Sequence, residues 1–397
     1  MLPLQGIRVL DLTRMVAGAY CSMILADLGA EVIKIEQPKV GDDTRQWGPP
    51  FIKGESAYFF CVNRNKKSLT LNLRKDKGKE IFRTLVGKAD VVLENFRTGT
   101  MEKYGLGYEA LKTLKPDLIY CSITGFGLSG PYKNRPGTDP ILQAMGGIFA
   151  LVGEADRKPC RIALPIVDMS SGLYAHGAIL AALIARSQDK QSHFIEISLL
   201  DNVLSLLLNL GSTYLNTGEI PMRQGNAHPN IVPFNVFEAK DRDVFLSASA
   251  DSRWKKLCQT LELEAMIDDP RFSTIKARIE HRHELDRLLQ ERLKEKTAGE
   301  WMERMDKTGE GTPFAPINTL DHVFQDPHVV SRDIVAEIEH PVTGKIRMVA
   351  PPVHYDGTRC EIRMPPPRLG EHNGEVLSRL LGYDEAQVAE LQKEGIL

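Results

Sequence analysis

The sequence lacks clustered cysteines, a large net charge and long apolar runs. Its six cysteines stand singly, without a C-x-x-C pair, which argues against a disulfide framework and favours a reducing compartment. A formal net charge of -2 gives no support for a nucleic-acid or membrane surface. No apolar run approaches the roughly 20 residues of a membrane span. We therefore expect a cytoplasmic protein, or a mitochondrial matrix protein whose leader has been removed, that binds neither nucleic acid nor membrane.

Several chemistry-bearing motifs are also missing. The ten histidines form no H-E-x-x-H, so we expect no metal site. There is no G-x-S-x-G for a serine hydrolase and no G-K-[ST] for a nucleoside triphosphate. The segment 125–130 matches G-x-G-x-x-G, but Pro131 and Pro136 follow it and prevent the helix that a dinucleotide site requires. We expect instead a loop whose backbone approaches a ligand.

Strands and helices alternate along the first half of the chain. Such β-α-β repeats predict a parallel α/β sheet covered on both faces. The segment 94–97 directly follows one of these strands, at the edge where open α/β sheets bind ligands. The expected strands are 7–12, 31–36, 69–73, 91–93, 118–123 and 193–199.

The organisation of the chain changes near residue 217. We predict a large α/β domain over 1–215 and a smaller α+β domain over 225–325, entered and left through segments that contain Pro and Gly. The segment 330–397 is predicted to return to the large domain, because it follows what reads as an insertion. A charged helical stretch at 276–296 is more typical of a solvated face than of a binding surface.

The most informative stretch is 165–175, where an apolar run delivers Asp168 to the start of a helix of small residues. Asp is a favoured helix cap, and the N–H groups and dipole of a helix start keep a carboxylate ionised. Asp168 is therefore either a cap only or a nucleophilic carboxylate, which is a known route to covalent catalysis. The stretch alone does not separate the two roles.

The stretch is one of several short segments whose order and spacing are distinctive together. The others are 4–11, 27–36, 63–68, 92–97 and 369–372. In this arrangement the chain resembles the class III CoA-transferase family, the formyl-CoA and carnitine CoA-transferase-like group. The resemblance covers nearly the whole chain. It implies a Rossmann-like large domain, a small domain and two subunits interlocked as a homodimer.

The resemblance also implies the chemistry. The Asp168 carboxylate would attack an acyl-CoA thioester, pass through a mixed anhydride and an aspartyl-CoA thioester, and hand CoA to an acceptor acid. CoA and acyl-CoA would then be substrates, with no permanently bound cofactor. The segments 41–51 and 225–233 are similar to those of members that use succinyl-CoA and glutarate, which suggests dicarboxylic acids. His228 or Arg14 would meet a distal carboxylate.

The residues that the resemblance places at CoA come from several segments. Gln37 stands where the family often carries Arg; Gln can hydrogen-bond adenine or ribose but cannot neutralise a phosphate, a task left to Lys39 or Arg45. Asp139 falls where some members place an acidic residue near the acyl group. The full set is Val16, Ala17, Gln37, Leu71, Arg74, Asn95, Phe96, Arg97, Lys103 and Asp139.

Two other functions remain open. Acyl-CoA racemases of the same superfamily resemble one another in a Gly-His-Asp, where this chain has Gly137-Thr138-Asp139. Thr cannot carry a proton near neutral pH, which disfavours racemisation. A non-catalytic CoA-binding protein would keep the fold without needing a nucleophile.

Overall fold

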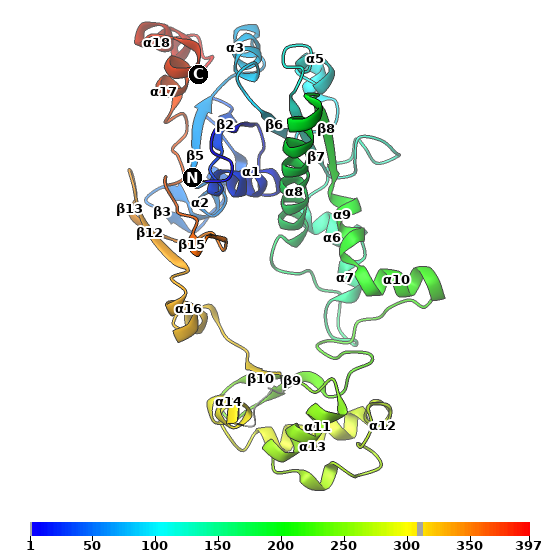
Figure 1. Cartoon of the computed structure of the whole chain (residues 1–397). Coiled ribbons are helices and arrows are strands. Elements are labelled where there is room, and N and C mark those ends of the chain that lie inside the picture. The colour runs from blue at the N-terminus through cyan, green and yellow to red at the C-terminus, as the bar shows by residue number, and fades with distance from the viewer. Residues whose placement is uncertain (1, 308–312) are drawn as a thin grey trace. The chain divides into compact units, whose positions relative to one another are not determined.

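The structure is a computed structural model that describes residues 2–307 and 313–397 (Figure 1). The chain forms two compact units. Unit 1 comprises Met1–Ile148, Arg161–Gly218 and Arg332–Leu397, and unit 2 comprises Phe149–Cys160 and Glu219–Ser331. Residues 308–312 of the predicted small domain lie outside the described residues.

The segment Phe149–Cys160 belongs to unit 2, so the expectation that residues 1–215 form one part of the large domain is wrong over this stretch. Hydrogen bonds hold it to the beginning of the small unit. Gly225 N donates to Gly153 O at 3.1 Å, and Arg223 Nη2 donates to Arg157 O at 3.0 Å. Because the two segments are far apart in the sequence, no local sequence pattern predicts that they pair.

The centre of unit 1 is a six-stranded sheet in the order β5-β2-β1-β6-β7-β8, with every pairing parallel. The chain runs outward from β1 through β2 to β5, then returns beside β1 and continues through β6, β7 and β8. This reversal creates a topological switch point between β1 and β6. The strands are β1 Arg8–Asp11, β2 Glu31–Glu36, β5 Lys66–Thr70, β6 Val91–Glu94, β7 Ile119–Thr124 and β8 His193–Ser198.

Helices cover both faces of the sheet. One face carries apolar strand residues such as Leu10, Ile33 and Val92, which pack on α3, α17 and α18 in a single buried cluster. Because side chains alternate along a strand, Asp11 and Lys34 point to the opposite face, toward α1. The helices of unit 1 are α1 Ala17–Asp27, α2 Ala57–Phe60, α3 Asp76–Val86, α4 Thr100–Lys103, α5 Tyr108–Leu111, α6 Asp139–Met145, α8 Ile166–Asp189, α9 Leu199–Leu206, α10 Leu208–Thr217, α17 Asn373–Leu381 and α18 Glu385–Lys393, with a 3₁₀ turn at Asp43–Gln46.

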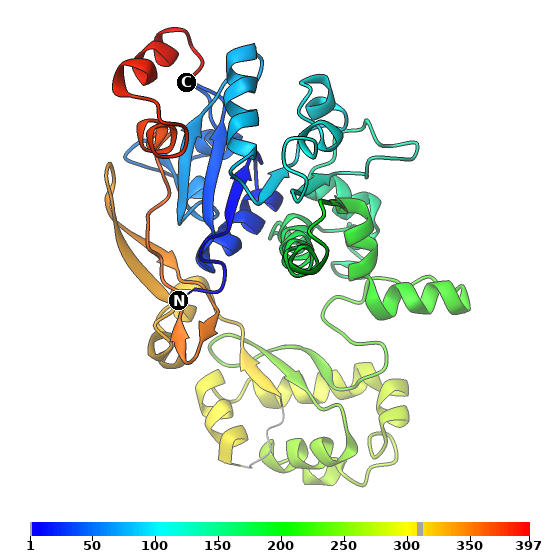
Figure 2. The same ribbon diagram turned by 45° about the horizontal axis from the view of Figure 1, so that its top comes forward.

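The C-terminal segment docks on the edge strand β5. Asn373 accepts a hydrogen bond from Thr70 N at 2.8 Å, and His372 Nδ1 accepts one from Ser68 N at 3.2 Å. These side chains satisfy N–H groups that an edge strand would otherwise expose. Both views place α17 and α18 beside α3 (Figures 1 and 2). The segment before them forms two small antiparallel pairs, and β3 with β4 forms another: β3 Phe51–Ile52, β4 Glu55–Ser56, β12 Val335–His340, β13 Gly344–Val349, β14 His354–Tyr355 and β15 Thr358–Arg359.

Helix α8 is long and apolar enough, by length and composition, to cross a membrane. The expectation that no apolar run approaches the length of a membrane span did not anticipate this helix. The helix packs on α1, α9, β7 and β8, as a helix that covers one face of a sheet does.

Unit 2 is built around a three-stranded antiparallel sheet in the order β11-β10-β9. Its own apolar core includes Trp254, Phe272 and Trp301, all essentially inaccessible to solvent. The elements are β9 Phe234–Glu238, β10 Asp243–Ser247, α11 Asp251–Thr260, a 3₁₀ turn at Glu264–Met266, α12 Ile275–Glu280, α13 Arg282–Leu293, α14 Ala298–Lys307, β11 Phe314–Pro316, α15 Leu320–Val323 and α16 Pro327–Ser331, with α7 Ile148–Leu151 at the boundary.

Candidate active site

A cavity of about 670 Å³ opens at the carboxyl edge of the sheet in unit 1. The loops after β1, β6 and β7 form part of its wall, next to the switch point, and the start of α8 completes it. Asp168 lies in this wall. So do five of the residues predicted to contact CoA, namely Val16, Ala17, Asn95, Phe96 and Arg97, together with Asp139.

Asp168 is not the cap of its helix. Helix α8 begins at Ile166, so Asp168 sits in the first helical turn, and its own N–H is bonded to a different carboxylate. Asp139 Oδ2 accepts from Val167 N at 2.8 Å and from Asp168 N at 3.1 Å. Of the two alternatives left open by the sequence, the cap-only role is excluded, because the residue that satisfies these N–H groups comes from α6, 29 positions earlier in the chain.

The carboxyl of Asp168 is therefore not held in its ionised form by the helix start. Burial raises the pKa of Asp168, and the neighbouring charge of Asp139 raises it further, to about 7. This contradicts the expectation that the helix N–H groups keep the group ionised, because those groups are already occupied. Near neutral pH the side chain exchanges a proton readily, and its carboxylate is more basic than an exposed one.

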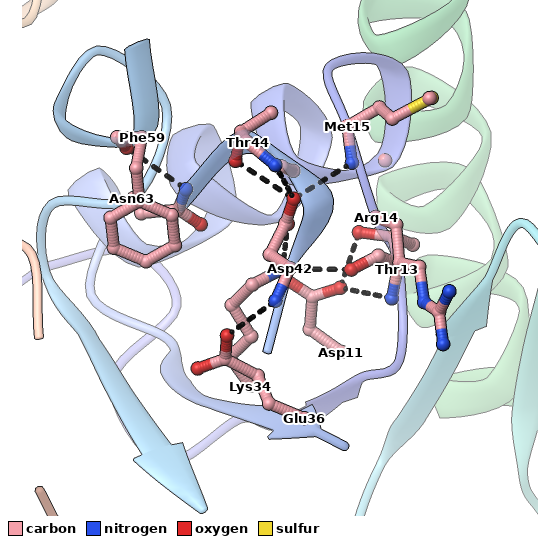
Figure 3. Close-up of polar contacts among 12 residues, drawn as sticks. Asp11, Thr13, Arg14, Met15, Lys34, Glu36, Asp42, Thr44, Phe59 and Asn63 are labelled. Atoms are coloured by element: carbon pink, nitrogen blue, oxygen red, sulfur yellow. Dashed lines mark hydrogen bonds and ion pairs between the residues drawn. The ribbon is translucent and has the colours of Figure 1, made fainter. Parts of the chain in front are cut away.

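The loop after β1, residues 13–16, is held in place on both sides of the switch point. Asn95 Oδ1 accepts from Arg14 N at 2.8 Å, and Asn95 Nδ2 donates to Arg14 O at 2.7 Å. Met15, which has a φ of 61°, donates its N–H to Asp42 Oδ1 at 3.1 Å. Figure 3 shows Asp42 beneath this loop, bonded to Met15 and to Thr44. One predicted CoA residue, Asn95, thus also fixes the backbone of the opposite loop.

Beneath the loop lies a buried cluster of charged side chains. Lys34 Nζ pairs with Asp42 at 2.8 Å and donates to Thr13 O at 2.7 Å. Lys66 Nζ lies 3.3 Å from Asp11, whose other oxygen accepts from Thr13 N. Burial raises the pKa of Asp42, but the Lys34 ammonium outweighs it and lowers the pKa to about 2. Since each charge in the cluster is paired, the loop above it has a defined conformation.

Glu94 closes β6 at the other side of the switch point. Its Oε2 accepts from Phe96 N at 2.8 Å, which shapes the turn that carries Asn95, Phe96 and Arg97. Burial raises the pKa of Glu94 to about 7. The sequence offered Glu94 only as a residue at a strand end.

A second, smaller cavity of about 60 Å³ lies on the other side of Phe96. It is lined by Gln37, Leu71 and Arg74, and Phe96 lines both cavities. The predicted CoA residues thus fall into two groups that meet at one aromatic ring. Lys103 lines neither cavity and is exposed at the end of α4.

The suggestion that Arg45 replaces the missing Arg at position 37 is wrong. Arg45 makes a two-pronged ion pair with Glu36, at 2.8 and 2.7 Å, and its guanidinium stacks 3.7 Å from the Phe59 ring. Because both interactions engage the Arg45 guanidinium within the protein, it does not take the place of the missing Arg at a CoA phosphate. Lys39 stays a prediction; it is exposed in a turn with a φ of 67°.

The sequence missed several residues of the large cavity. Lys133, Arg135 and Arg161 bring positive charge to its wall, and Trp47 and Tyr58 bring aromatic surface. Their segments are loops or short helices without periodicity, so no local pattern marked them. The only signal was the pair of prolines around 131–136, which correctly ruled out a helix there.

Comparison with known proteins identifies the family. The profile of CoA-transferase family III matches residues 4–373. The chain belongs to CoA-transferase family III. It is 39% identical to the Homo sapiens protein named succinyl-CoA:glutarate CoA-transferase, over 100% of this chain and 90% of that one. It is 40% identical to the Agrobacterium fabrum protein named succinate--glutarate CoA-transferase, over 95% of this chain and 96% of that one.

A solved structure of a similar protein has the same fold. The crystal structure of a CAIB/BAIF family protein from Brucella suis superposes with a TM-score of 0.86 at 40% identity, and covers 96% of this chain and 99% of that one. This CoA-transferase combines a six-stranded parallel sheet with smaller antiparallel sheets, which confirms the α/β prediction.

Proposed function

We propose that this CoA-transferase moves CoA from an acyl-CoA donor to a dicarboxylic acid through covalent intermediates on Asp168. The single observation that supports this most strongly is the position of Asp168. It is a carboxyl group in the wall of a 670 Å³ cavity, on the first turn of a helix. No histidine or cysteine lines this cavity among the described residues, so Asp168 and Asp139 are its carboxyl candidates for a nucleophile. Of these, Asp139 already accepts three N–H bonds.

The exchange balances without any added reagent. The Asp168 carboxylate attacks the thioester carbonyl of the donor, the C–S bond breaks, and CoA leaves as a thiolate from an aspartyl anhydride. The thiolate then attacks the Asp168 carbonyl, which releases the donor acid and leaves an aspartyl-CoA thioester. The acceptor carboxylate repeats the two steps in reverse order, so acyl-CoA forms and Asp168 is regenerated.

The two cavities suit the two ends of CoA. The smaller one, with Gln37 and Arg74, would hold part of the nucleotide end, while the large one would admit the pantetheine arm and the acyl group. Phe96, which lines both cavities, would lie beside the point where the CoA molecule passes from one cavity to the other. Arg97 on the wall of the large cavity has the charge to meet a phosphate.

The lining of the large cavity favours an acid with a second carboxylate. Lys133, Arg135 and Arg161 form no ion pair with any residue in the described part of the chain. A dicarboxylic acid, as in the names of the two relatives, would supply the missing negative charge after its first carboxylate has reacted at Asp168. A monocarboxylic acid would leave these cations without an anionic partner.

We further propose that the enzyme acts as a homodimer. Helix α10 has no buried residue, and Leu204, Leu208 and Leu215 on α9 and α10 are each more than half exposed. A second copy is the occupant that the family resemblance suggests for such a face. Light scattering should give twice the mass of one chain, and the mass of a single chain would overturn the proposal.

One experiment tests the reaction. The protein is incubated with succinyl-CoA and a panel of mono- and dicarboxylic acids, and the acyl-CoA products are followed by mass. Hydroxylamine trapping with peptide mass analysis then locates the modified residue. We expect glutarate-sized dicarboxylates to be the best acceptors and the adduct to map to Asp168. Transfer at the wild-type rate by Asp168→Ala would overturn the proposal, and binding of acyl-CoA without transfer by the wild type would favour a binding protein.

A further inference from the structure

Asp139 is the residue most closely tied to the nucleophile. It opens α6, is 6% exposed, and accepts hydrogen bonds from three donors. Its Oδ2 accepts the N–H groups of Val167 and Asp168 at 2.8 and 3.1 Å. Its Oδ1 accepts from Gln143 Nε2 at 2.6 Å. A carboxyl that only accepts hydrogen bonds, from N–H donors at the positive end of a helix, is placed as a carboxylate.

This carboxylate has no cation beside it. No Lys, Arg or His lies within ion-pair distance of Asp139 across residues 2–307 and 313–397, whereas the other buried aspartates, Asp11, Asp42 and Asp27, each pair with one. Its charge is therefore balanced by helix N–H groups and by an amide. Asp139 also holds the backbone of Asp168. A negative charge on the Asp168 side chain is therefore repelled by the Asp139 carboxylate, and little solvent screens that repulsion.

The remaining contacts of the first turn of α8 fix its backbone. From α9, Asn202 Nδ2 donates to Val167 O at 3.1 Å. From the segment before α8, Ile162 N donates to Gln143 Oε1 at 2.9 Å. Gln143 thus connects Ile162, in the segment before α8, with the Asp139 carboxylate that caps α8. The first turn is held on both sides, and only the Asp168 side chain is left to the cavity.

Resting on the proposed covalent mechanism, we propose that Asp139 is a positioning residue that caps α8 from outside and whose fixed charge favours conversion of Asp168 into its uncharged acyl forms. In the anhydride and in the aspartyl-CoA thioester, Asp168 carries no charge, so the repulsion between the two carboxylates disappears. In the free enzyme the two carboxylates repel each other. This repulsion raises the free energy of the resting Asp168 carboxylate, so the covalent intermediates are more favourable relative to it.

The sharpest test is Asp139→Asn, which keeps an oxygen for the two backbone N–H groups and removes the charge. The fraction of Asp168 in covalent form after mixing with succinyl-CoA, measured by intact mass, should fall about tenfold. The loss should be in kcat more than in KM. The acid limb of kcat/KM should move down by about 1 pH unit, because a like charge raises the pKa of a carboxyl.

The other ionisable groups of the cavity wall stay in place in this variant. These are Tyr58 from α2, Arg97 after β6, and Lys133, Arg135 and Arg161 from the loops. Their contribution to the pH profile is therefore common to the wild type and the variant. Asp139→Glu, which restores the charge, should return the acid limb toward the wild-type position even if its longer side chain lowers kcat.

The matched control is Asp384→Asn, which alters an Asp that caps α18 by accepting from Gln387 N at 2.8 Å. It should leave the adduct fraction and pH profile unchanged. An Asp139→Asn enzyme with the wild-type adduct fraction and acid limb would overturn the inference. If the Asn variant does not fold, an Asp139→Glu enzyme whose acid limb lies about 1 pH unit below that of the wild type, despite the restored charge, would do so. Absence of any adduct in the wild type would instead reject the covalent mechanism.

Discussion

Gly172 of α8 lies directly against the backbone of Ala17 of α1. A Cβ at position 172 would stand 2.6 Å from Ala17 O and 3.3 Å from Cys21 N. The two helices therefore touch through their main chains, which only a residue without a side chain allows. Asp168 precedes Gly172 by one turn on the same helix face. This contact brings Asp168 to the loop that ends at Val16.

Replacing Gly172 by Ala should separate the two helices. The added methyl meets a backbone oxygen, which cannot rotate away, so we expect a loss of about 1–3 kcal/mol in the free energy of unfolding. CoA transfer should fall at least tenfold, because Asp168 moves away from Val16. Gly177→Ala on the same helix is the control, because a Cβ at position 177 would meet no atom within 4 Å. It should stabilise the protein by up to about 1 kcal/mol, and equal effects of the two substitutions would contradict the contact.

Asp42→Asn should destabilise the protein strongly. It leaves the fully buried Lys34 without its partner at 2.8 Å, and breaking a buried ion pair in this way costs about 3–5 kcal/mol. Urea unfolding followed by circular dichroism measures the change. Asp76→Asn removes an exposed pair with Lys79 at 2.9 Å and should leave the free energy of unfolding close to that of the wild type, because water screens an exposed pair. A small effect at Asp42 would mean that the cluster does not hold the loop.

Asp168→Asn should inactivate the enzyme and stabilise it, with an effect that grows with pH. Because folding raises the pKa of Asp168 from 3.8 to about 7, the folded protein keeps a proton through this range that the unfolded chain has lost. Stability of the wild type therefore falls as the pH rises through the range, and Asn is not subject to this loss. The Tm difference between variant and wild type should be small at about pH 5 and largest at about pH 8. A difference that is constant with pH would show that the carboxyl titrates normally.

Arg161→Gln should separate dicarboxylic from monocarboxylic substrates. If Arg161 binds the distal carboxylate, KM for succinyl-CoA should rise about 10-fold or more, because the substitution removes a charge-assisted hydrogen bond. KM for acetyl-CoA, which has no distal carboxylate, should change little. Steady-state kinetics with the two donors measure the ratio. Arg83→Gln on α3, which lines neither cavity, serves as the control for a lost surface charge. Equal changes for both donors would remove Arg161 from recognition of the acid.

The alternation of apolar strands and helices predicted the parallel sheet, because periodicity records which side of an element is buried. Strand ends were placed within a few residues: the expected strand at 31–36 is β2 Glu31–Glu36, and that at 91–93 is β6 Val91–Glu94. The C-terminal 369–372 segment was noted as a motif only. The structure shows its purpose, since Gly370 and His372 bond Ser68 on the edge strand.

What the sequence by itself determined is the class of sheet, the family and the identity of the carboxyl at the start of α8. These depend on local pattern or on segments in a fixed order. Tertiary structure alone decided that Asp139 caps that helix, that Lys34 and Asp42 lie buried under the loop before α1, and that Arg45 is already paired with Glu36. Each of these depends on a contact between residues brought together by packing, and the energy of a buried charge is set by its neighbours in space rather than in sequence.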